Sequence, residues 1–343
     1  MGVDLADLIS KEKTTLDQLS GRSIAVDGYN SLYQFLAIIR GPTGEPLMDR
    51  QGRITSHLSG LLYRTTNMAE KGIRLVYVFD GVPPSLKEAE IKRRSKVKEE
   101  ALAKYEEALK RGDLQEAKRH AQATSRLKDL MVDDAKKLLD TLGVPWIQAP
   151  SEGEAQAAYL ASKGDVWAAA SQDYDSLLFG APRLIRNLAI SGRRKLPRRQ
   201  AYVEVEPELV ELSKALSGLG ITREQLVDLG ILIGTDYNPS GVKGIGPKTA
   251  LKMLKEHGSL DKIPSTLQAE FPEAPARIRQ IFLAPEVSET YSLEWKEPKI
   301  DEIIEFLCKQ RDFSEDRVRN AVERMMAGVK EREKKRTLDS FFR

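Results

Sequence analysis

The sequence has one cysteine, Cys308, and three histidines, His57, His120 and His257, in 343 residues. One cysteine cannot form an intrachain disulfide or a thiolate zinc cluster, and such low cysteine use fits a reducing, intracellular compartment. The three histidines are far apart in the sequence, which argues against a histidine-rich metal site. Acid–base chemistry and metal binding therefore fall to carboxylates.

Long apolar runs are also absent. No stretch approaches the roughly 18 consecutive apolar residues that a membrane-spanning helix needs, and the N-terminal MGVDLADLIS has neither the basic nor the apolar region of a signal peptide. With 41% hydrophobic and 31% charged residues, the chain can form one large domain or two ordinary ones. We expect an intracellular globular protein that does not enter a membrane.

Charge is nearly balanced overall, with 54 Lys and Arg against 51 Asp and Glu, but it is unevenly placed. Residues 87–128 hold 13 basic and 8 acidic side chains, and the run SGRRKLPRRQ (191–200) holds five basic residues and no acid. Either segment alone is typical of a solvated helix face or loop. The two together favour a polyanionic partner.

Apolar runs of strand length alternate with longer amphipathic segments, and this pattern predicts an α/β fold with a mostly parallel central sheet. Ligands of such sheets bind beyond the carboxyl ends of the strands, so acids at those ends should gather at one edge. Three of the runs end on an aspartate: SIAVD (23–27), LVYVFD (75–80) and VWAAASQD (166–173), which end on Asp27, Asp80 and Asp173.

Two further features concern the helical parts of the chain. Residues 84–137 are rich in Lys, Glu, Ala and Leu, which predicts two charged helices with a break at residues 111–113. Such a pair is either a solvated appendage or, given its basic excess, a DNA-facing element. After about Val205 the strand signals fade, and we expect helices to dominate through Gly328.

Acids are concentrated in PSEGEAQAAYL (150–160), SQDYDSLLFG (171–180) and LIGTDYN (232–238). Clustered carboxylates repel one another unless cations neutralise them, and oxygen-only ligands suit Mg²⁺ or Mn²⁺. Each acid alone has a structural reading, such as a capping box from Ser151 to Glu154. The full set favours a metal-dependent phosphoryl-transfer site: Asp27, Asp80, Glu152, Glu154, Asp173, Asp175 and Asp236.

The segment GVKGIGPKTALKMLKEHGS (241–259) has a Gly-x-Gly turn leading into a helix with Pro247 near its first turn. Free amides at that helix N-terminus can meet a phosphate. The segment resembles a helix-hairpin-helix module, which holds duplex DNA by its backbone. A P-loop would need Gly-Lys-Ser/Thr, and Pro247 interrupts that pattern. An ordinary helix turn is the remaining reading.

Six blocks in order resemble the flap endonuclease 1 family of structure-specific 5′ nucleases, in its archaeal type. The resemblance covers essentially the whole chain and implies a PIN-like 5′ nuclease fold with a helical arch and a helix-hairpin-helix. The blocks are IAVDGYNSLYQFL (24–36), TSHLSGLLYRT (55–65), VYVFDGVPPSLK (76–87), APSEGEAQAAYL (149–160), SQDYDSLLFG (171–180) and GTDYNPSGVKGIGPKTA (234–250).

The resemblance implies roles for the acids and for two basic residues. Asp27, Asp80, Glu152 and Glu154 would serve a first divalent ion, Mg²⁺ or a substituting Mn²⁺. Asp173, Asp175 and Asp236 would serve a second ion. Two such ions activate water and stabilise the leaving oxygen. Lys87 and Arg94 match basic residues that, with Asp80, Glu152 and Asp173, form the catalytic set.

The resemblance also implies DNA contacts and a division of the chain. Tyr33 would stack on a base; the other expected contacts are Arg40, Thr55, Arg64, Glu152, Gly234, Asp236, Lys243, Gly244, Gly246 and Lys248. A monovalent cation would accompany the helix-hairpin-helix. The expected parts are an N-terminal nuclease region (1–98), an arch (87–130), an internal nuclease region (116–258) with the helix-hairpin-helix (234–256), a helical region (259–328) and a tail (329–343).

The tail sequence KRTLDSFF (335–342) resembles the sliding-clamp-binding peptide, with Lys335 where Gln is usual and Leu338, Phe341 and Phe342 as anchors. The implied protein is a monomeric Mg²⁺-dependent 5′ flap endonuclease and 5′-to-3′ exonuclease. It would act on flap DNA with the sliding clamp (PCNA) at replicating DNA, in the cytoplasm or nucleoid. The alternatives are a bubble or four-way-junction nuclease of the same superfamily and a non-catalytic, clamp-associated DNA scaffold.

Overall fold

The computed structural model describes residues 2–41, 44–121, 127, 129–190, 192–195, 202–263 and 275–341. Side chains are described for all of these except 118, 119, 192–195, 202–204 and 331–341. Among the described helices, none is long and apolar enough to cross a membrane.

The centre of the molecule is a seven-stranded sheet in the order β1-β9-β6-β5-β2-β3-β4, in which β2 to β6 pair in parallel. This confirms the predicted α/β fold with a mostly parallel sheet. The strands are β1 (Glu12–Lys13), β2 (Ser23–Asp27), β3 (Arg74–Phe79), β4 (Trp146–Gln148), β5 (Ala168–Ala170), β6 (Arg183–Arg186) and β9 (Glu208–Glu211). A separate pair is formed by β7 (Gly192–Lys195) and β8 (Tyr202–Val205).

Helices dominate the described residues after Val205, as expected, but the short strand β9 was not anticipated there. It pairs antiparallel with β6 and carries β1 on its other edge. Only four residues long, with Glu at both ends, β9 is too short for an alternation pattern to be visible in the sequence. The neighbouring edge of β6 and the burial of Val210 decide the pairing.

Side chains that alternate along the strands enter two separate cores, because successive residues of a strand point to opposite faces. Ala25, Val76 and Ala169 pack on one face, whereas Ile24, Leu75 and Ala168 pack on the other. The first core is covered by α6 (Gly153–Lys163), α7 (Asp175–Leu178), α8 (Leu212–Leu219), α9 (Arg223–Ile233), α10 (Pro247–His257), η4 (Leu260–Lys262) and α12 (Pro275–Leu283). The second is covered by α1 (Gly28–Ile38), α2 (Ser56–Glu70), α5 (Asp129–Leu142), η3 (Leu188–Ile190), α13 (Ile300–Ile304), η5 (Glu305–Lys309) and α14 (Glu315–Phe341).

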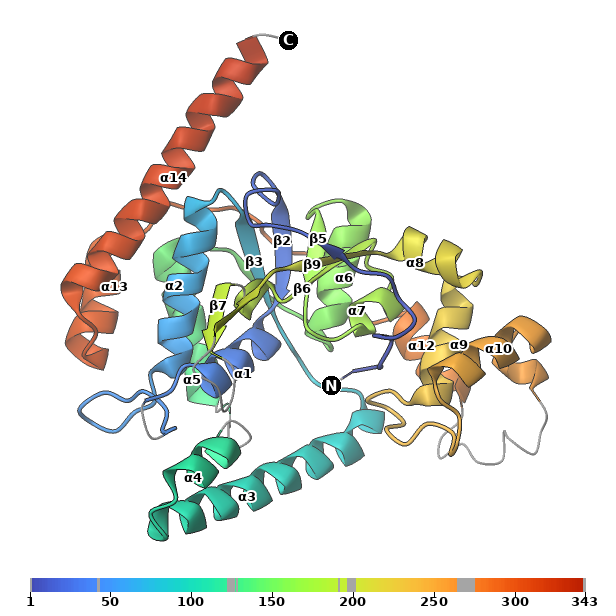
Figure 1. Cartoon of the computed structure of the whole chain (residues 1–343). Helices are drawn as coiled ribbons and strands as arrows, with labels where there is room; N and C mark the ends of the chain where they lie inside the picture. Colours follow the sequence, from blue (N-terminus) through green and yellow to red (C-terminus); the bar gives the residue numbers. More distant parts are fainter. Residues whose placement is uncertain are drawn as a thin grey trace.

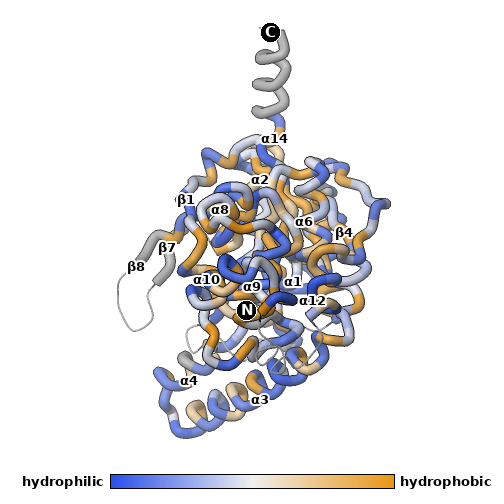
Figure 2. The backbone as a smooth tube through the Cα atoms, turned by 90° about the vertical axis from the view of Figure 1, so that its right-hand side faces the viewer, coloured by the Kyte–Doolittle hydropathy of each residue, from blue (hydrophilic) through white to orange (hydrophobic). Residues whose placement is uncertain are grey.

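The two predicted charged helices project from the body (Figures 1 and 2). A short turn, η1 (Ser85–Lys87), leads into α3 (Glu88–Lys110), and α4 (Leu114–Ala121) returns alongside it. The predicted break at 111–113 is confirmed, because Gly112 there has φ of 73°, a conformation that glycine adopts without strain. Most of α3 is coloured hydrophilic in Figure 2, and only Glu90, Ala101 and Ala108 of this helix are buried.

Candidate active site

The acids predicted at strand ends do meet at one edge of the sheet. Asp27 is the last residue of β2, Asp80 follows β3, and Asp173 lies three residues after β5. In the strand order β5 and β3 flank β2, and the chain crosses over between β4 and β5. This is the topological switch point, where ligands of open α/β sheets bind.

Glu152 joins this edge because two turns approach each other closely. The amide of Gly81 donates to Ser151 O at 2.6 Å, and Gly153 N donates to Asp80 Oδ1 at 2.6 Å. A Cβ on Gly81 would collide with the carbonyls of Ala149 and Pro150, so only glycine allows this approach. The turn after β3 and the start of α6 are thereby held together.

Ser151 and Glu154 do not form the capping box that was considered as an alternative for this segment. Helix α6 is capped by Glu152, which makes no side-chain capping bond, and Ser151 is buried. Glu154 instead accepts a short hydrogen bond from the hydroxyl of Ser171. By contrast, Asp27 does cap α1, because its Oδ1 accepts from Asn30 N at 2.9 Å. A cap and a functional carboxylate are therefore compatible at Asp27.

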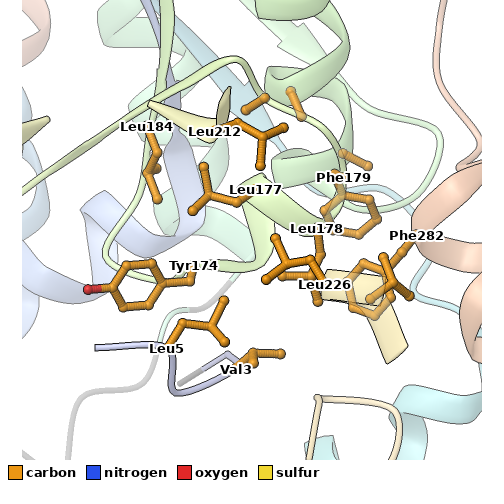
Figure 3. Packing of buried hydrophobic residues seen from close by; sticks show 14 of the residues in the cluster. Val3, Leu5, Tyr174, Leu177, Leu178, Phe179, Leu184, Leu212, Leu226 and Phe282 are labelled. Atoms are coloured by element: carbon orange, nitrogen blue, oxygen red, sulfur yellow. The ribbon is translucent and has the colours of Figure 1, made fainter. Parts of the chain in front are cut away.

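The N-terminal segment reaches the site, which sequence reasoning missed. Val3 N donates to Asp175 Oδ1 at 2.7 Å, and a Cβ on Gly2 would overlap that carboxylate. Figure 3 shows Val3 and Leu5 packed near Leu178 and Leu226. The apolar pattern of Val3 and Leu5 was the available signal, since both are buried.

Lys87 and Arg94 extend from the base of the projecting helices into the acids. Lys87 Nζ lies 2.5 Å from Glu152 Oε2 and 3.4 Å from Asp236 Oδ2. Arg94 forms an ion pair with Asp236, which follows α9 in the turn at Thr235–Asn238, and a second pair with Glu90 at 2.6 Å. Lys87 thus bridges an acid of the first predicted ion site and one of the second, whereas Arg94 pairs with Asp236 of the second site.

Burial and mutual repulsion dominate the electrostatics of the cluster. Burial, with the charge of Asp80, raises the pKa of Asp27 well above its usual value. Burial and the charges of Asp175 and Asp173 do the same for the pKa of Glu154. Burial and the charge of Asp236 raise the pKa of Asp175 to about 7. Cations in the cluster would therefore lower its free energy.

Burial by itself would lower the pKa of Lys87. The negative charges of Glu152 and Asp236 have a larger effect in the opposite direction, so the pKa of Lys87 is raised. As the side chains stand, no three acids, histidines or cysteines of the described residues form a ready metal-binding group. The ammonium of Lys87 and the guanidinium of Arg94 occupy the space among the acids instead.

The donor set nevertheless fits hard divalent cations. It consists of carboxylate oxygens, the ligands that Mg²⁺ and Mn²⁺ prefer. Oxygen Oε1 of Glu152 is buried with no hydrogen-bond partner among the described residues. A buried acceptor without a partner is costly, and a cation beside it would remove that cost.

The residues expected to contact DNA differ in how they are placed. Tyr33, on α1, has its ring covered by Lys98 Nζ at 4.1 Å from the centroid. Arg40 donates to Leu36 O and Gly44 O, and so closes the loop after α1. Thr55 is buried at the start of α2. Arg64 is half-buried, and burial lowers its pKa.

The segment predicted as a helix-hairpin-helix (234–256) begins directly after α9 and consists of a turn followed by α10. Gly234, with φ of 110°, ends α9, and Gly246 caps α10 with Pro247 in its first turn, as expected. Lys243, Gly244 and Lys248 are exposed beside that helix N-terminus. The backbone thus presents amides and basic side chains to solvent.

Several predicted residues lie outside the described part of the chain. They are Phe342, residues 196–199 of the basic run, and the side chains of Arg193, Arg194, Lys195, Lys335, Leu338 and Phe341.

Two family models match the chain. The XPG N-terminal domain matches residues 1–101, and the XPG I-region matches residues 143–236. The two matched segments contain all seven acids of the cluster, and Asp236 is the last residue of the second segment. Fold and site together define an XPG-type nuclease.

Comparison with individual proteins and solved structures identifies the family within this class. The flap endonuclease 1 of Hyperthermus butylicus is 61% identical over 96% of each chain, and that of Staphylothermus marinus is 58% identical over 98% of each. The structure of flap endonuclease-1 from Methanococcus jannaschii superposes with a TM-score of 0.77 at 42% identity, covering 96% of this chain and all of that one. The catalytic core of Rad2 with DNA substrate, at 22% identity and a TM-score of 0.70 over 95% of this chain and all of that one, shares the fold. The chain belongs to the flap endonuclease 1 family.

Proposed function

We propose that the protein is a structure-specific 5′ flap endonuclease that hydrolyses DNA phosphodiesters where single and double strands meet. A 5′-to-3′ exonuclease activity would use the same site. The observation that carries this proposal is the convergence of seven acids with Lys87 and Arg94 at the base of α3 and α4. Carboxylates, two cations and a charged helical pair thus lie side by side, which supports a role in binding and cutting a phosphodiester.

Nucleases of this family generally use divalent metal ions. Two Mg²⁺ ions, or Mn²⁺ in their place, would supply an activated water and stabilise the leaving oxygen. We assign them to the acids predicted from the sequence: Asp27, Asp80, Glu152 and Glu154 for the first, and Asp173, Asp175 and Asp236 for the second.

The chain's own cations act on the scissile phosphate. Lys87 and Arg94 now neutralise Glu152 and Asp236. The ammonium and the guanidinium would contact the phosphate oxygens and stabilise the charge that develops there. Tyr33 would stack on a base near the cut, provided that Lys98 leaves the face of the ring.

Duplex DNA would lie along α1, α2 and α10. Arg40, Thr55 and Arg64 would line one arm of the bent duplex. The turn before α10 would hold the other arm through backbone amides, Lys243 and Lys248, with a monovalent cation beside Gly244 and Gly246. In this arrangement α3 and α4 form the arch through which the free 5′ strand passes.

The biological setting follows from the substrate. We propose that the protein acts as a monomer at replicating DNA in the cytoplasm or nucleoid, in Okazaki fragment maturation and repair. It would bind the sliding clamp (PCNA) through Leu338, Phe341 and Phe342. The division of the chain into nuclease regions, arch, helical region and tail remains part of this proposal.

The test is cleavage of a 5′-labelled double-flap DNA, with Mg²⁺ or with EDTA. Wild type should release the flap only with Mg²⁺. Asp173→Ala should lose at least about a thousandfold in rate and still bind the flap. Asp17→Ala, which removes an exposed carboxylate paired with Lys71, is the matched control and should cut like wild type.

Two outcomes would contradict the proposal. Flap binding without metal-dependent cleavage by wild type would establish the scaffold alternative. Faster cleavage of a bubble or a four-way junction than of the flap would establish another nuclease of the superfamily.

A further inference from the structure

A buried serine joins two acids of the cluster. The hydroxyl of Ser171 donates a short hydrogen bond to Glu154 Oε1 and accepts one from Asp173 N at 3.2 Å. Ser171 is 6% exposed, and its own amide donates to Ile185 O on β6 at 3.2 Å. The hydroxyl is therefore fixed to the sheet and touches both an acid of α6 and the loop after β5.

Glu154 needs such an anchor. Its side chain has three rotatable bonds, and burial places it near the charges of Asp175, Asp173 and Asp27. Repulsion favours rotation of the Glu154 carboxylate away from these neighbours. The hydrogen bond from Ser171 holds the Glu154 carboxylate among them. Because the backbone of Ser171 is already fixed in the fold, forming this bond restricts little besides the Glu154 side chain.

We propose that Ser171 is a positioning residue that holds Glu154 and the Asp173 loop in one arrangement, and so aligns the two divalent-ion sites with each other. Groups that hydrogen-bond to metal ligands orient them and tune metal affinity. The inference rests on the proposed function, since it concerns the ions assigned there. In this role Ser171 would act through Glu154 and the Asp173 loop and not on the substrate itself.

The chain offers a matched pair of serines for the test. Ser176, five residues further on in α7, is 1% exposed, and its hydroxyl has no hydrogen-bond partner among the described residues. Ser171→Ala and Ser176→Ala thus make the same chemical change at two buried sites. Ser171→Thr restores a hydroxyl at the same position, where Ser171 lines a small cavity with Asn30 and Gln34.

The first measurement is Mn²⁺ affinity without DNA, by titration calorimetry or by the electron paramagnetic resonance of free Mn²⁺. Ser171→Ala should bind Mn²⁺ about 10-fold to 100-fold more weakly, and Ser171→Thr should recover most of that loss. Flap cleavage should show a lower kcat with an unchanged KM, because DNA is held elsewhere. Ser176→Ala should match wild type in both assays.

Wild-type Mn²⁺ affinity and kcat in Ser171→Ala would overturn the positioning role, as would equal losses in Ser176→Ala. Failure of Ser171→Thr to recover would show that the hydroxyl is not the active group. If Ser171→Ala melts below the assay temperature, Ser171→Cys carries the same prediction, because a thiol is a weak donor. Absence of flap cleavage by wild type would instead refute the proposed function.

Discussion

Replacement of Asp175 by Asn should stabilise the metal-free protein. Asp175 is 5% exposed and stands among acids that raise its pKa to about 7, chiefly through burial and the charge of Asp236. An amide has the same shape, keeps an oxygen for Val3 N and carries no charge. The variant therefore removes the repulsion without removing the contact.

The magnitude follows from the pKa. Between the ordinary value of 3.8 and about 7 lie roughly three pKa units, which correspond to about 4 kcal/mol at most. The folded pKa is raised, so the stability that protonated Asp175 contributes is complete below pH 3.8 and is lost as pH rises through 7. The advantage of Asn should be near zero at pH 4 and reach its plateau above pH 7.

The assay is thermal unfolding of wild type and Asp175→Asn in EDTA, at pH 4.5 and pH 8. Unfolding entropy of about 2 cal/mol/K per residue predicts a Tm increase of about 5 °C at pH 8 and a small one at pH 4.5. Asp17→Ala, an exposed change, should shift neither. An increase that is the same at both pH values, or a decrease at pH 8, would refute the electrostatic reasoning.

Two further predictions concern other parts of the chain. His57 is fully buried, with no hydrogen-bond partner for either ring nitrogen among the described residues, and burial lowers its pKa to about 4. As pH falls from 6.5 to 4, wild type should lose up to about 3 kcal/mol that a His57→Leu variant keeps; equal pH dependence in urea unfolding would exclude this. Replacing both Phe341 and Phe342 by Ala should abolish stimulation of flap cleavage by a sliding clamp and leave basal cleavage intact; undiminished stimulation would rule out the tail as the clamp-binding peptide.

Sequence reasoning went furthest where a local rule acts. The strand at 23–27 and the helix break at Gly112 are set by side-chain patterning and backbone sterics within a few residues. The convergence of Asp27, Asp80 and Asp173 also followed, because parallel strands place their carboxyl ends together. Short strand β9 was missed because its pairing depends on a partner strand 22 to 28 residues away in the sequence. The capping-box alternative for Glu154 could not be excluded from the sequence, because a capping box and a site acid share one pattern.

The sequence by itself determined the composition of the site. Without cysteine ligands or clustered histidines, a metal centre had to be built from acids, and the order of strands and acids along the chain determined which acids could meet. Only the tertiary structure decided how their charge is balanced: Lys87 and Arg94 enter from the base of α3, Val3 N binds Asp175, and Ser171 joins Glu154 to the Asp173 loop. These contacts link residues up to 172 positions apart. They depend on burial and on the close approach of turns, and no pattern within one segment records either.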